Sequence, residues 1–163
     1  TNVYLSLTEH SRDGWYYSIG AVIFGGMGVF TAITAVILRR RSIASYNELY
    51  QTYPELQGNL VGIADQADYY NQDLKVILYK NHLITYFKGT QTVDLREVDQ
   101  IYLIENSYHR YGFTNKVYQL CYIRKDSPKK HNMTIRTTRT VQEQLEEFWE
   151  LLMEKFPDIH LGV

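Results

Sequence analysis

The sequence predicts an α+β protein in which one membrane-spanning helix precedes a single domain of antiparallel strands. Three observations favour this fold class. A segment without charged residues or histidine runs from Gly14 to Leu38. From Leu74 onward, short runs rich in β-branched and aromatic residues alternate with turn-forming residues, as in antiparallel sheets. An amphipathic helical pattern follows between Thr140 and Pro157.

The uncharged segment has the length of a transmembrane helix, which we place at residues 15–38. A hydrocarbon core about 30 Å thick needs roughly 20 helical residues. The mean hydropathy of the chain is −0.33, so its apolar character is concentrated in this segment. A core helix of this length normally has a polar face. A signal peptide has its positive charges before the apolar run. This segment has neither property, so the sequence favours a span.

Both ends of the span have residues suited to a membrane interface. Aromatic rings stand at the first end: Trp15, Tyr16 and Tyr17. Three arginines stand at the other: Arg39, Arg40 and Arg41. Because basic residues near span ends stay in the cytoplasm, we expect the N-terminus outside and the C-terminal part inside, at the plasma membrane. The chain begins with Thr1 and not Met, so a further segment, including another span, can precede it.

Small residues form one stripe along the predicted span. They recur at spacings of three and four: Ser18, Ala21, Gly25, Gly28, Ala32 and Ala35. Because lipid tails are as apolar as leucine, helices associate in a bilayer where small side chains let the backbones approach. The seven-residue repeat fits a left-handed crossing. We therefore expect a transmembrane helix partner, either a second copy or a different protein.

The chain is expected to have five parts. They are an extracytoplasmic tail (1–14), the span (15–38), a basic juxtamembrane segment with a short helix (39–59), a cytoplasmic domain (60–157) and a C-terminal tail (158–163). Apolar and tyrosine side chains three and four apart predict that short helix from Ser42 to Tyr53, and Pro54 ends it. Such a helix can lie on the inner headgroups or cap the soluble domain, and the sequence does not decide between the two.

The part of the chain after the span is electrically neutral. It has sixteen basic and sixteen acidic residues. It therefore has neither an acidic tail nor the strongly basic surface of a nucleic-acid-binding protein, and we expect no nucleic-acid partner. The single cysteine, Cys121, excludes a disulfide within these residues, which agrees with a reducing cytoplasm.

About seven short antiparallel strands are expected between residues 60 and 136. They are 60–64, 74–79, 83–87, 91–95, 100–105, 117–124 and 133–136. Between the second and third strands, residues 80–82 predict a tight turn in which Asn81 supplies the unusual backbone angle. Polar residues predict an exposed loop at 106–115 and a turn at 125–130.

One amphipathic helix is expected after the strands. Thr140 and Glu143 have the spacing of a capping box, and Pro157 ends the pattern. The apolar side chains form a face about 100° wide. They are Val141, Leu145, Phe148, Trp149, Leu152 and Phe156. A lone amphipathic helix needs an apolar surface to cover, and the open end of a bent sheet or half-barrel provides one.

Strands in this number, capped by one C-terminal helix, have the element order of a pleckstrin-homology-like (PH-like) domain. Residues 93–101 (VDLREVDQI) resemble the polar–Leu–x–x–Val/Ile–x–x–Ile step of bacterial membrane-anchored PH-like families such as the YcxB-like group. The hairpin at 74–87 is similar to the one that precedes this step, and the resemblance covers roughly residues 60–157. It implies a PH-like half-barrel and a non-enzymatic scaffold at the inner face of a membrane, with no catalytic residues to transfer.

No residue pattern points to an enzyme. Metal sites need clustered ligands, whereas the histidines are scattered at positions 10, 82, 109, 131 and 160. Cys121 lies between apolar strand residues, where a buried inert thiol is expected. The glycines at 25–28 lie within the span and cannot hold a phosphate group. We therefore expect no catalytic residue, no metal and no cofactor.

A basic cluster is the remaining candidate site. It gathers in the predicted turn between the last strands: Arg124, Lys125, Lys129, Lys130 and His131. Solvation accounts for such a turn, and contact with anionic lipid headgroups or an acidic partner is its functional interpretation. These features together predict a membrane-anchored interaction or assembly module. The alternative is a sensor that binds anionic lipid or another ligand at the inner face of the membrane.

Overall fold

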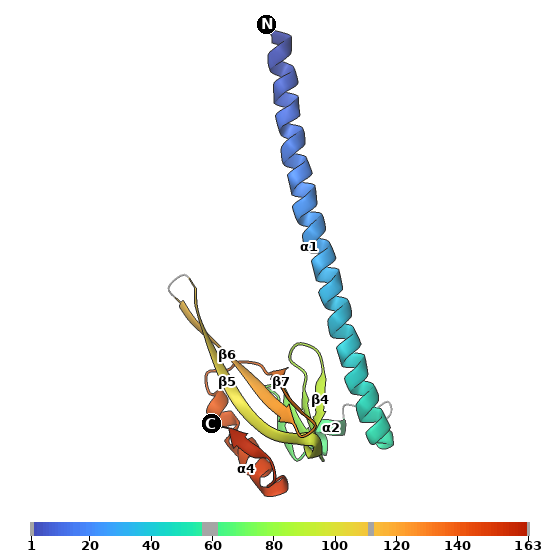
Figure 1. The fold of residues 1–163 in the computed structure, drawn as a ribbon, viewed down its shortest axis with the longest axis vertical. Coiled ribbons are helices and arrows are strands. Elements are labelled where there is room, and N and C mark those ends of the chain that lie inside the picture. The colour runs from blue at the N-terminus through green and yellow to red at the C-terminus, as the bar shows by residue number, and fades with distance from the viewer. Residues whose placement is uncertain (1, 57–61, 111–112, 163) are drawn as a thin grey trace. The chain divides into compact units, whose positions relative to one another are not determined.

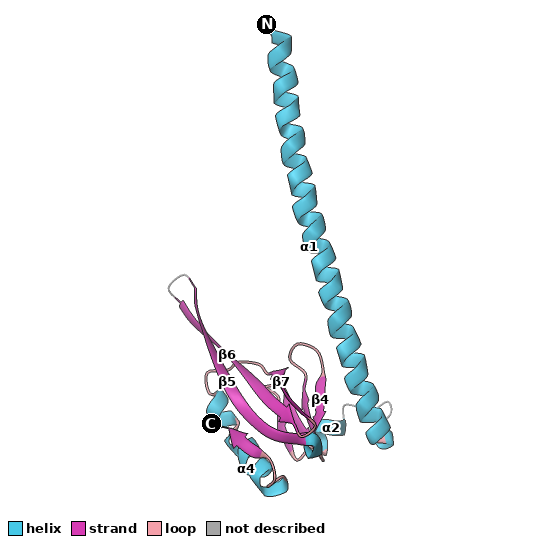
Figure 2. Cartoon of the chain, viewed as in Figure 1, coloured by secondary structure: helices cyan, strands magenta, loops and turns pink. Residues whose placement is uncertain are grey.

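The computed structural model describes residues 2–56, 62–110 and 113–162. These residues form an α+β structure with one long apolar helix near the N-terminus and eight strands in two sheets (Figures 1 and 2). The chain divides into two compact units, Thr1–Arg40 and Arg41–Val163. The boundary between them falls inside helix α1 (Asn2–Thr52).

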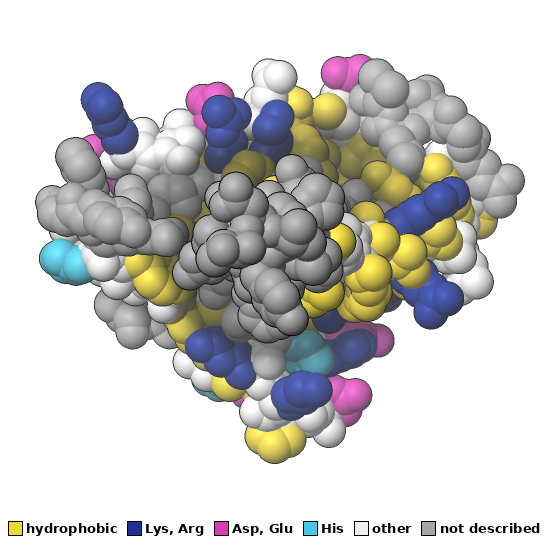
Figure 3. Space-filling model, turned by 90° about the horizontal axis from the view of Figure 1, so that it is seen from above, with side chains coloured by type: hydrophobic (Ala, Val, Ile, Leu, Met, Phe, Trp, Pro, Cys, Tyr) yellow, Lys and Arg dark blue, Asp and Glu magenta, His cyan; other side chains and the backbone are white. Residues whose placement is uncertain are grey.

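In the first unit, α1 exposes apolar side chains around its circumference. Every side chain from Ala21 to Leu38 is exposed, including Phe24 at 77% and Phe30 at 73%. Exposed hydrophobic side chains are visible in Figure 3, where they are yellow. A helix that is apolar on all sides is stable in a protein interior or in a bilayer. The described residues contain one helix that is long and apolar enough to span a membrane, and its apolar stretch begins at Ala21.

The hydroxyl groups of the two threonines in this segment donate hydrogen bonds to backbone carbonyl groups of the same helix. Thr31 Oγ1 donates to the carbonyl oxygen of Met27 at 2.8 Å, and Thr34 Oγ1 donates to that of Phe30 at 2.9 Å. A polar group in the hydrocarbon core has no water to bond with, so it must find its partner inside the protein. These two hydroxyl groups meet that requirement.

Helix α1 is longer than the sequence predicts. It begins at Asn2, where we expected a tail without structure of its own, and it includes the short helix expected after Ser42. The physical reason is that no proline precedes Pro54, so nothing in the sequence stops the helix earlier. The backbone of residues 15–17 is helical, whereas the side chains of the predicted interface residues Trp15, Tyr16 and Tyr17 lie outside the described part.

The second unit begins with a four-stranded antiparallel sheet. Its strands are β1 (Tyr69–Asn71), β2 (Val76–Tyr79), β3 (His82–Thr85) and β4 (Gln91–Asp94), in that order across the sheet. The first strand predicted at residues 60–64 is wrong. Residues 57–61 lie outside the described part, and Gly62–Asp65 form the short helix α2.

The turn between β2 and β3 uses a different residue from the one predicted. Lys80, and not Asn81, has a positive φ, of 51°. For a residue with a Cβ atom this conformation costs of order 1 kcal/mol. Lys80 recovers part of this cost through its side chain, because Nζ bonds Glu55 at 2.6 Å and lies 4.8 Å from the ring centroid of Tyr53.

The second sheet contains the longest strands. They are β5 (Val98–Arg110), β6 (Phe113–Arg124), β7 (Ser127–Thr134) and β8 (His160–Gly162), in the order β7-β6-β5-β8. Strand β8 pairs with β5 in parallel, so the prediction of antiparallel strands alone is wrong here, and residues 160–162 belong to a strand where we expected a tail. The remaining pairs are antiparallel.

Strands β5 and β6 extend into the segment predicted as a loop, over residues 106–110 and 113–115. Cross-strand polar contacts lie at the base of this extension: Lys116 Nζ lies 2.7 Å from Glu105 Oε1, and Tyr118 Oη donates to Glu105 Oε2 at 2.7 Å. Cross-strand pairs of opposite charge favour strand pairing. Polar composition predicted a loop because it does not distinguish solvated coil from a strand pair whose polar side chains contact each other.

The apolar pattern near the C-terminus forms two helices, α3 (Val141–Gln144) and α4 (Glu146–Lys155), separated at Leu145. The predicted capping box is absent, because the Thr140 side chain accepts no capping hydrogen bond. The ψ of Thr140 is 35°, away from the extended value that an N-cap residue adopts.

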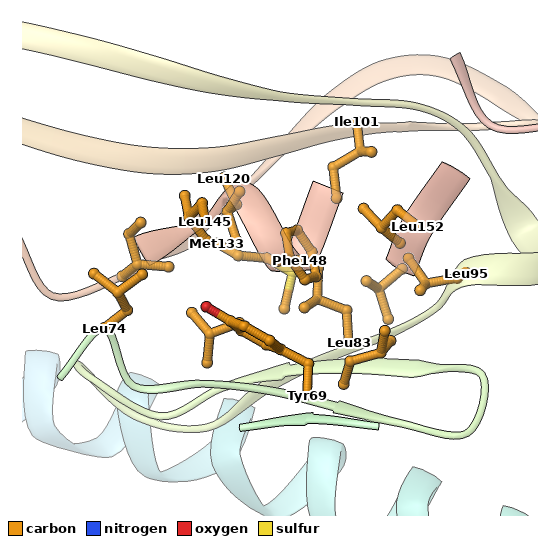
Figure 4. Packing of buried hydrophobic residues seen from close by; sticks show 14 of the residues in the cluster. Tyr69, Leu74, Leu83, Leu95, Ile101, Leu120, Met133, Leu145, Phe148 and Leu152 are labelled. Carbon is orange, nitrogen blue, oxygen red and sulfur yellow. The ribbon is translucent and has the colours of Figure 1, made fainter. Parts of the chain in front are cut away.

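The main core lies between the two sheets and these helices (Figure 4). Phe148 and Leu152 of α4 are fully buried in it, and Tyr69 of β1 packs against Phe148 with ring centroids 5.5 Å apart. The step at residues 93–101 also contributes here. Here the chain passes from β4 through the 3-10 helix η2 (Leu95–Glu97) into β5. All four apolar residues of the step are buried: Val93, Leu95, Val98 and Ile101.

A second, smaller core lies on the other face of the first sheet. It is formed by the C-terminal part of α1, the 3-10 helix η1 (Pro54–Leu56), α2 and the strands β2 and β3. Its buried members are Leu49, Tyr53, Leu56, Ile63, Tyr79 and Ile84. Strand β3 is therefore buried on both faces, since Leu83 points into the main core and Ile84 into the smaller one.

Candidate functional site

The last turns of α1, residues 41–52, are fixed to the first sheet, and we call them the docking segment. Three hydrogen bonds join its side chains to β4 and the residue before it. Ser42 Oγ accepts from the backbone N of Thr90 at 3.0 Å, and Tyr46 Oη accepts from Thr90 Oγ1 at 2.7 Å. Glu48 Oε2 accepts from Thr92 Oγ1 at 2.9 Å. The sequence allowed this segment to lie on the inner headgroups or on the soluble domain. In the structure it lies on the soluble domain.

A buried histidine lies under the end of the docking segment. His82 is 1% exposed, and its Nδ1 lies 3.0 Å from Tyr53 Oη. Its Nε2 lies 3.8 Å from Glu48 Oε1. Burial lowers the pKa of His82 below the ordinary 6.5, against the opposing effect of the Asp94 and Glu48 carboxylates. His82 is therefore a buried, hydrogen-bonded part of this contact, and burial favours its neutral form.

The small residues predicted as a helix-packing stripe lie along α1. Ala21, Ala32 and Ala35 are exposed, and a Cβ atom added at Gly25 or Gly28 would meet nothing within 4 Å. The side chain of the sixth member, Ser18, lies outside the described part. The described members of the stripe are thus exposed on the surface of the helix.

The structure separates the basic cluster into different environments. Arg124 forms ion pairs with Glu97 and, at 3.7 Å, with Asp126. Lys125 lies in the turn after β6, whereas Lys129, Lys130 and His131 belong to β7 and not to the predicted turn. Among the described residues, neither Lys125 nor Lys129 has a carboxylate within ion-pairing distance.

The remaining two members of the cluster meet the docking segment at an open groove of about 480 Å³. We call it the basic groove. Its lining comes from the docking segment (Arg41, Ala44, Ser45), from β4 and the residue before it (Thr90, Gln91, Thr92), and from β6 and β7 (Tyr122, Lys130, His131, Asn132, Met133). Sequence reasoning noted Arg41 and Lys130 separately. Nothing in the sequence signals that residues so far apart in the chain line the same groove.

Side-chain contacts order the β7 wall of the groove. Gln91 bridges the two sheets, since its Oε1 accepts from Thr134 N at 3.0 Å and its Nε2 donates to the carbonyl oxygen of Asn132 at 3.5 Å. The rings of His131 and Tyr122 stack with centroids 5.1 Å apart. Lys130 Nζ lies 5.6 Å from the ring centroid of Tyr102.

A second cavity, of about 340 Å³, lies on the other side of the docking segment. Apolar side chains and tyrosines dominate its lining: Tyr46, Leu49, Ile63, Ala64, Tyr70, Ile77, Ile84, Tyr86 and Thr90. This lining has no cationic side chain, so it does not suit an anion. The two cavities share Thr90.

The described residues contain no group of three or more His, Cys, Asp or Glu side chains that could hold a metal ion. Cys121 is fully buried, and this burial raises the pKa of its thiol. Its Sγ also contacts Asn132 Oδ1 at 3.3 Å. A buried thiol with a raised pKa is a poor nucleophile.

No protein-family model, curated protein or solved structure matches this chain.

Proposed function

We propose that the chain is a membrane-anchored, non-enzymatic module for interaction and assembly, with a PH-like domain on the cytoplasmic side. The observation that carries this proposal is the dual character of α1. Its apolar part is long enough to span a bilayer, and its docking segment packs into the β domain through Leu49. One helix thus contributes both to a membrane anchor and to the core of a folded domain.

Two features support the orientation and the PH-like fold. Arg39, Arg40 and Arg41 follow the apolar part directly, and basic residues at a span end favour the cytoplasmic side. The seven strands β1 to β7 are paired antiparallel in two sheets, and α4 buries its apolar face between them, as a PH-like half-barrel requires. The parallel strand β8 is an addition to that arrangement.

The proposed assembly contact is the stripe of small residues on α1. Gly25 and Gly28 have open space at their Cα atoms, so a second helix can approach closely there. The partner is a second copy of the chain or another membrane protein. In either case the docking segment would present the β domains of the assembly at the cytoplasmic face.

The test is a cross-linking and co-purification experiment on the full chain in mild detergent. Replacing Gly25 and Gly28 by Leu should abolish the cross-linked or co-purified partner, because the larger side chains keep the backbones apart. Gly26→Leu is the matched control, since Gly26 lies off the stripe and has the same open surroundings. Equal recovery of the partner with both variants would rule out the stripe as the contact.

The second candidate function is contact with an anionic lipid surface, and it is favoured by Lys125 and Lys129. Both side chains are exposed and have no ion-pair partner among the described residues. Each such charge contributes about 1 kcal/mol near anionic lipid. In nanodiscs, phosphatidylserine should slow hydrogen exchange at residues 125–130, and added salt should reverse the effect. Exchange that does not depend on lipid charge would exclude this function.

A further inference from the structure

The basic groove collects positive charge that no side chain of its lining neutralises. Arg41 and Lys130 both line it, and among the described residues neither has a carboxylate within ion-pairing distance. The Nζ of Lys130 lies over the ring of Tyr102, which is outside the lining, so this exposed side chain must rotate to face a ligand in the groove. The lining contains no Asp or Glu. By contrast, Arg124 on the neighbouring strand has two carboxylate partners. An unneutralised pair of cations in a concave site favours an anionic occupant.

The docking segment presents one face of its helix to this groove. Arg41, Ala44 and Ser45 are three and four residues apart, so they lie side by side on the helix surface. The small side chain of Ala44 leaves room for a ligand to approach the helix. The acidic residue of the same segment, Glu48, is not part of the lining, and its carboxylate accepts a hydrogen bond from Thr92.

The opposite wall is ordered before any ligand binds. Gln91 connects β4 to β7 through two hydrogen bonds, and His131 is stacked on Tyr122. Hydrogen-bond donors of this wall are therefore held in place, which reduces the entropy lost on binding. Asn132 adds an amide group beside Lys130 in the lining.

We propose that the basic groove binds a phosphate monoester. A monoester carries a charge of about −1.5 to −2 at pH 7, which matches the two permanent cations. The planar guanidinium of Arg41 can bond two phosphate oxygens at once, whereas Lys130 acts as a point charge. The groove volume of about 480 Å³ exceeds what a phosphate group needs, so the group esterified to the phosphate also fits.

The monoester can belong to a lipid headgroup or to a soluble molecule. If the ligand is a lipid, this inference rests on the second candidate function. If the ligand is soluble, it rests on the groove alone. The two functions use different residues. Lys125 and Lys129 would contact an anionic surface of any composition, whereas the groove should distinguish a monoester from a singly charged phosphodiester.

The experiment is a calorimetric titration of the full chain in micelles of an uncharged detergent. Glycerol 3-phosphate is the soluble probe, phosphatidic acid mixed into the micelles is the lipid probe, and phosphatidylglycerol is the diester comparison. Arg41→Gln and Lys130→Gln should each weaken monoester binding about tenfold or more, because each removes a charge-assisted contact. Ala44→Glu, which places a carboxylate in the groove, should abolish it.

Arg40→Gln and Lys88→Gln are the controls, because they remove the same charges from exposed positions outside the lining. Monoester affinity should stay within about twofold of the parent chain in both. Binding of glycerol 3-phosphate supports a soluble ligand, and binding of phosphatidic acid alone supports a lipid. Absence of binding to both monoesters, equal affinity for the diester, or equal loss in the groove and control variants would overturn the proposal. Loss only in Lys125→Gln and Lys129→Gln would support the second candidate function instead.

Discussion

His82 shows how a single buried side chain links the helix to the sheet. Its Nδ1 faces the hydroxyl of Tyr53, and the carboxylates of Glu48 and Asp94 act on it from α1 and β4. Arg96 and Glu97 add smaller, opposing effects. Burial is the largest influence and lowers the pKa of His82, so the folded state favours the neutral imidazole.

This lowered pKa predicts a pH dependence of stability. Well above pH 6.5 the imidazole is mostly neutral in both the folded and the unfolded chain. As the pH falls below the unfolded value of 6.5, the unfolded chain takes up a proton that the folded chain does not. The free energy of unfolding should therefore fall with decreasing pH, by at most about 1.4 kcal/mol per pH unit from this group. Chemical denaturation of the full chain in detergent at pH 5 to 7 measures this slope.

His82→Gln should flatten the slope, because glutamine does not titrate. His109→Gln is the comparison variant, since it removes an exposed histidine of β5 that lies outside this contact. A parent-like slope in His82→Gln would show that another group titrates in this range.

Other single residues show the limits of sequence reasoning. Asn81 was predicted to adopt the unusual backbone angle of the β2–β3 turn because asparagine tolerates it, yet Lys80 adopts it. The contacts of the Lys80 side chain with Glu55 and Tyr53 lie outside the turn, so local propensity could not reveal them. The meeting of Arg41 and Lys130 in one groove was likewise invisible, since it depends on how α1 packs on the sheet edge.

At the scale of elements, the docking segment is the part of α1 that stabilises the domain. Leu49 is 1% exposed and packs with Tyr53 and Ile84 in the smaller core. Leu49→Ala should lower the free energy of unfolding of the β domain by about 2–5 kcal/mol, because it removes buried methyl groups and leaves a cavity. Near-UV circular dichroism of the tyrosines during denaturation follows this transition.

Ile43→Ala provides the comparison, because Ile43 lies on the same helix but is 47% exposed. Its effect should be within about 0.5 kcal/mol of the parent chain. Similar losses in the two variants would mean that the docking segment does not pack on the sheet in solution.

The pattern of residue types predicted the strands that lie between recognisable turns. Runs of β-branched and aromatic residues bounded by turn-forming residues placed β2, β3 and β4 within a few residues. It failed for β8, which is three residues long, and for the outer halves of β5 and β6. Those strands are held by pairing with other strands, and pairing leaves no local pattern in the sequence.

At the scale of the whole molecule, the account depends on the apolar part of α1. The sequence identified it because it lacks charge over a length that suits a bilayer, and the structure exposes its apolar side chains from Ala21 to Leu38. Water does not stabilise such a surface. A signal sequence shares its length and composition, so the decisive property is whether this helix is retained in the membrane-bound protein.

The most direct measurement is therefore the intact mass of the chain recovered from membranes washed with alkaline carbonate. We predict that the chain stays in the washed membranes, is released only by detergent, and has a mass that includes residues 15–38. Recovery of the chain in the carbonate wash, or a membrane-bound species that lacks those residues, would contradict the anchoring role of α1.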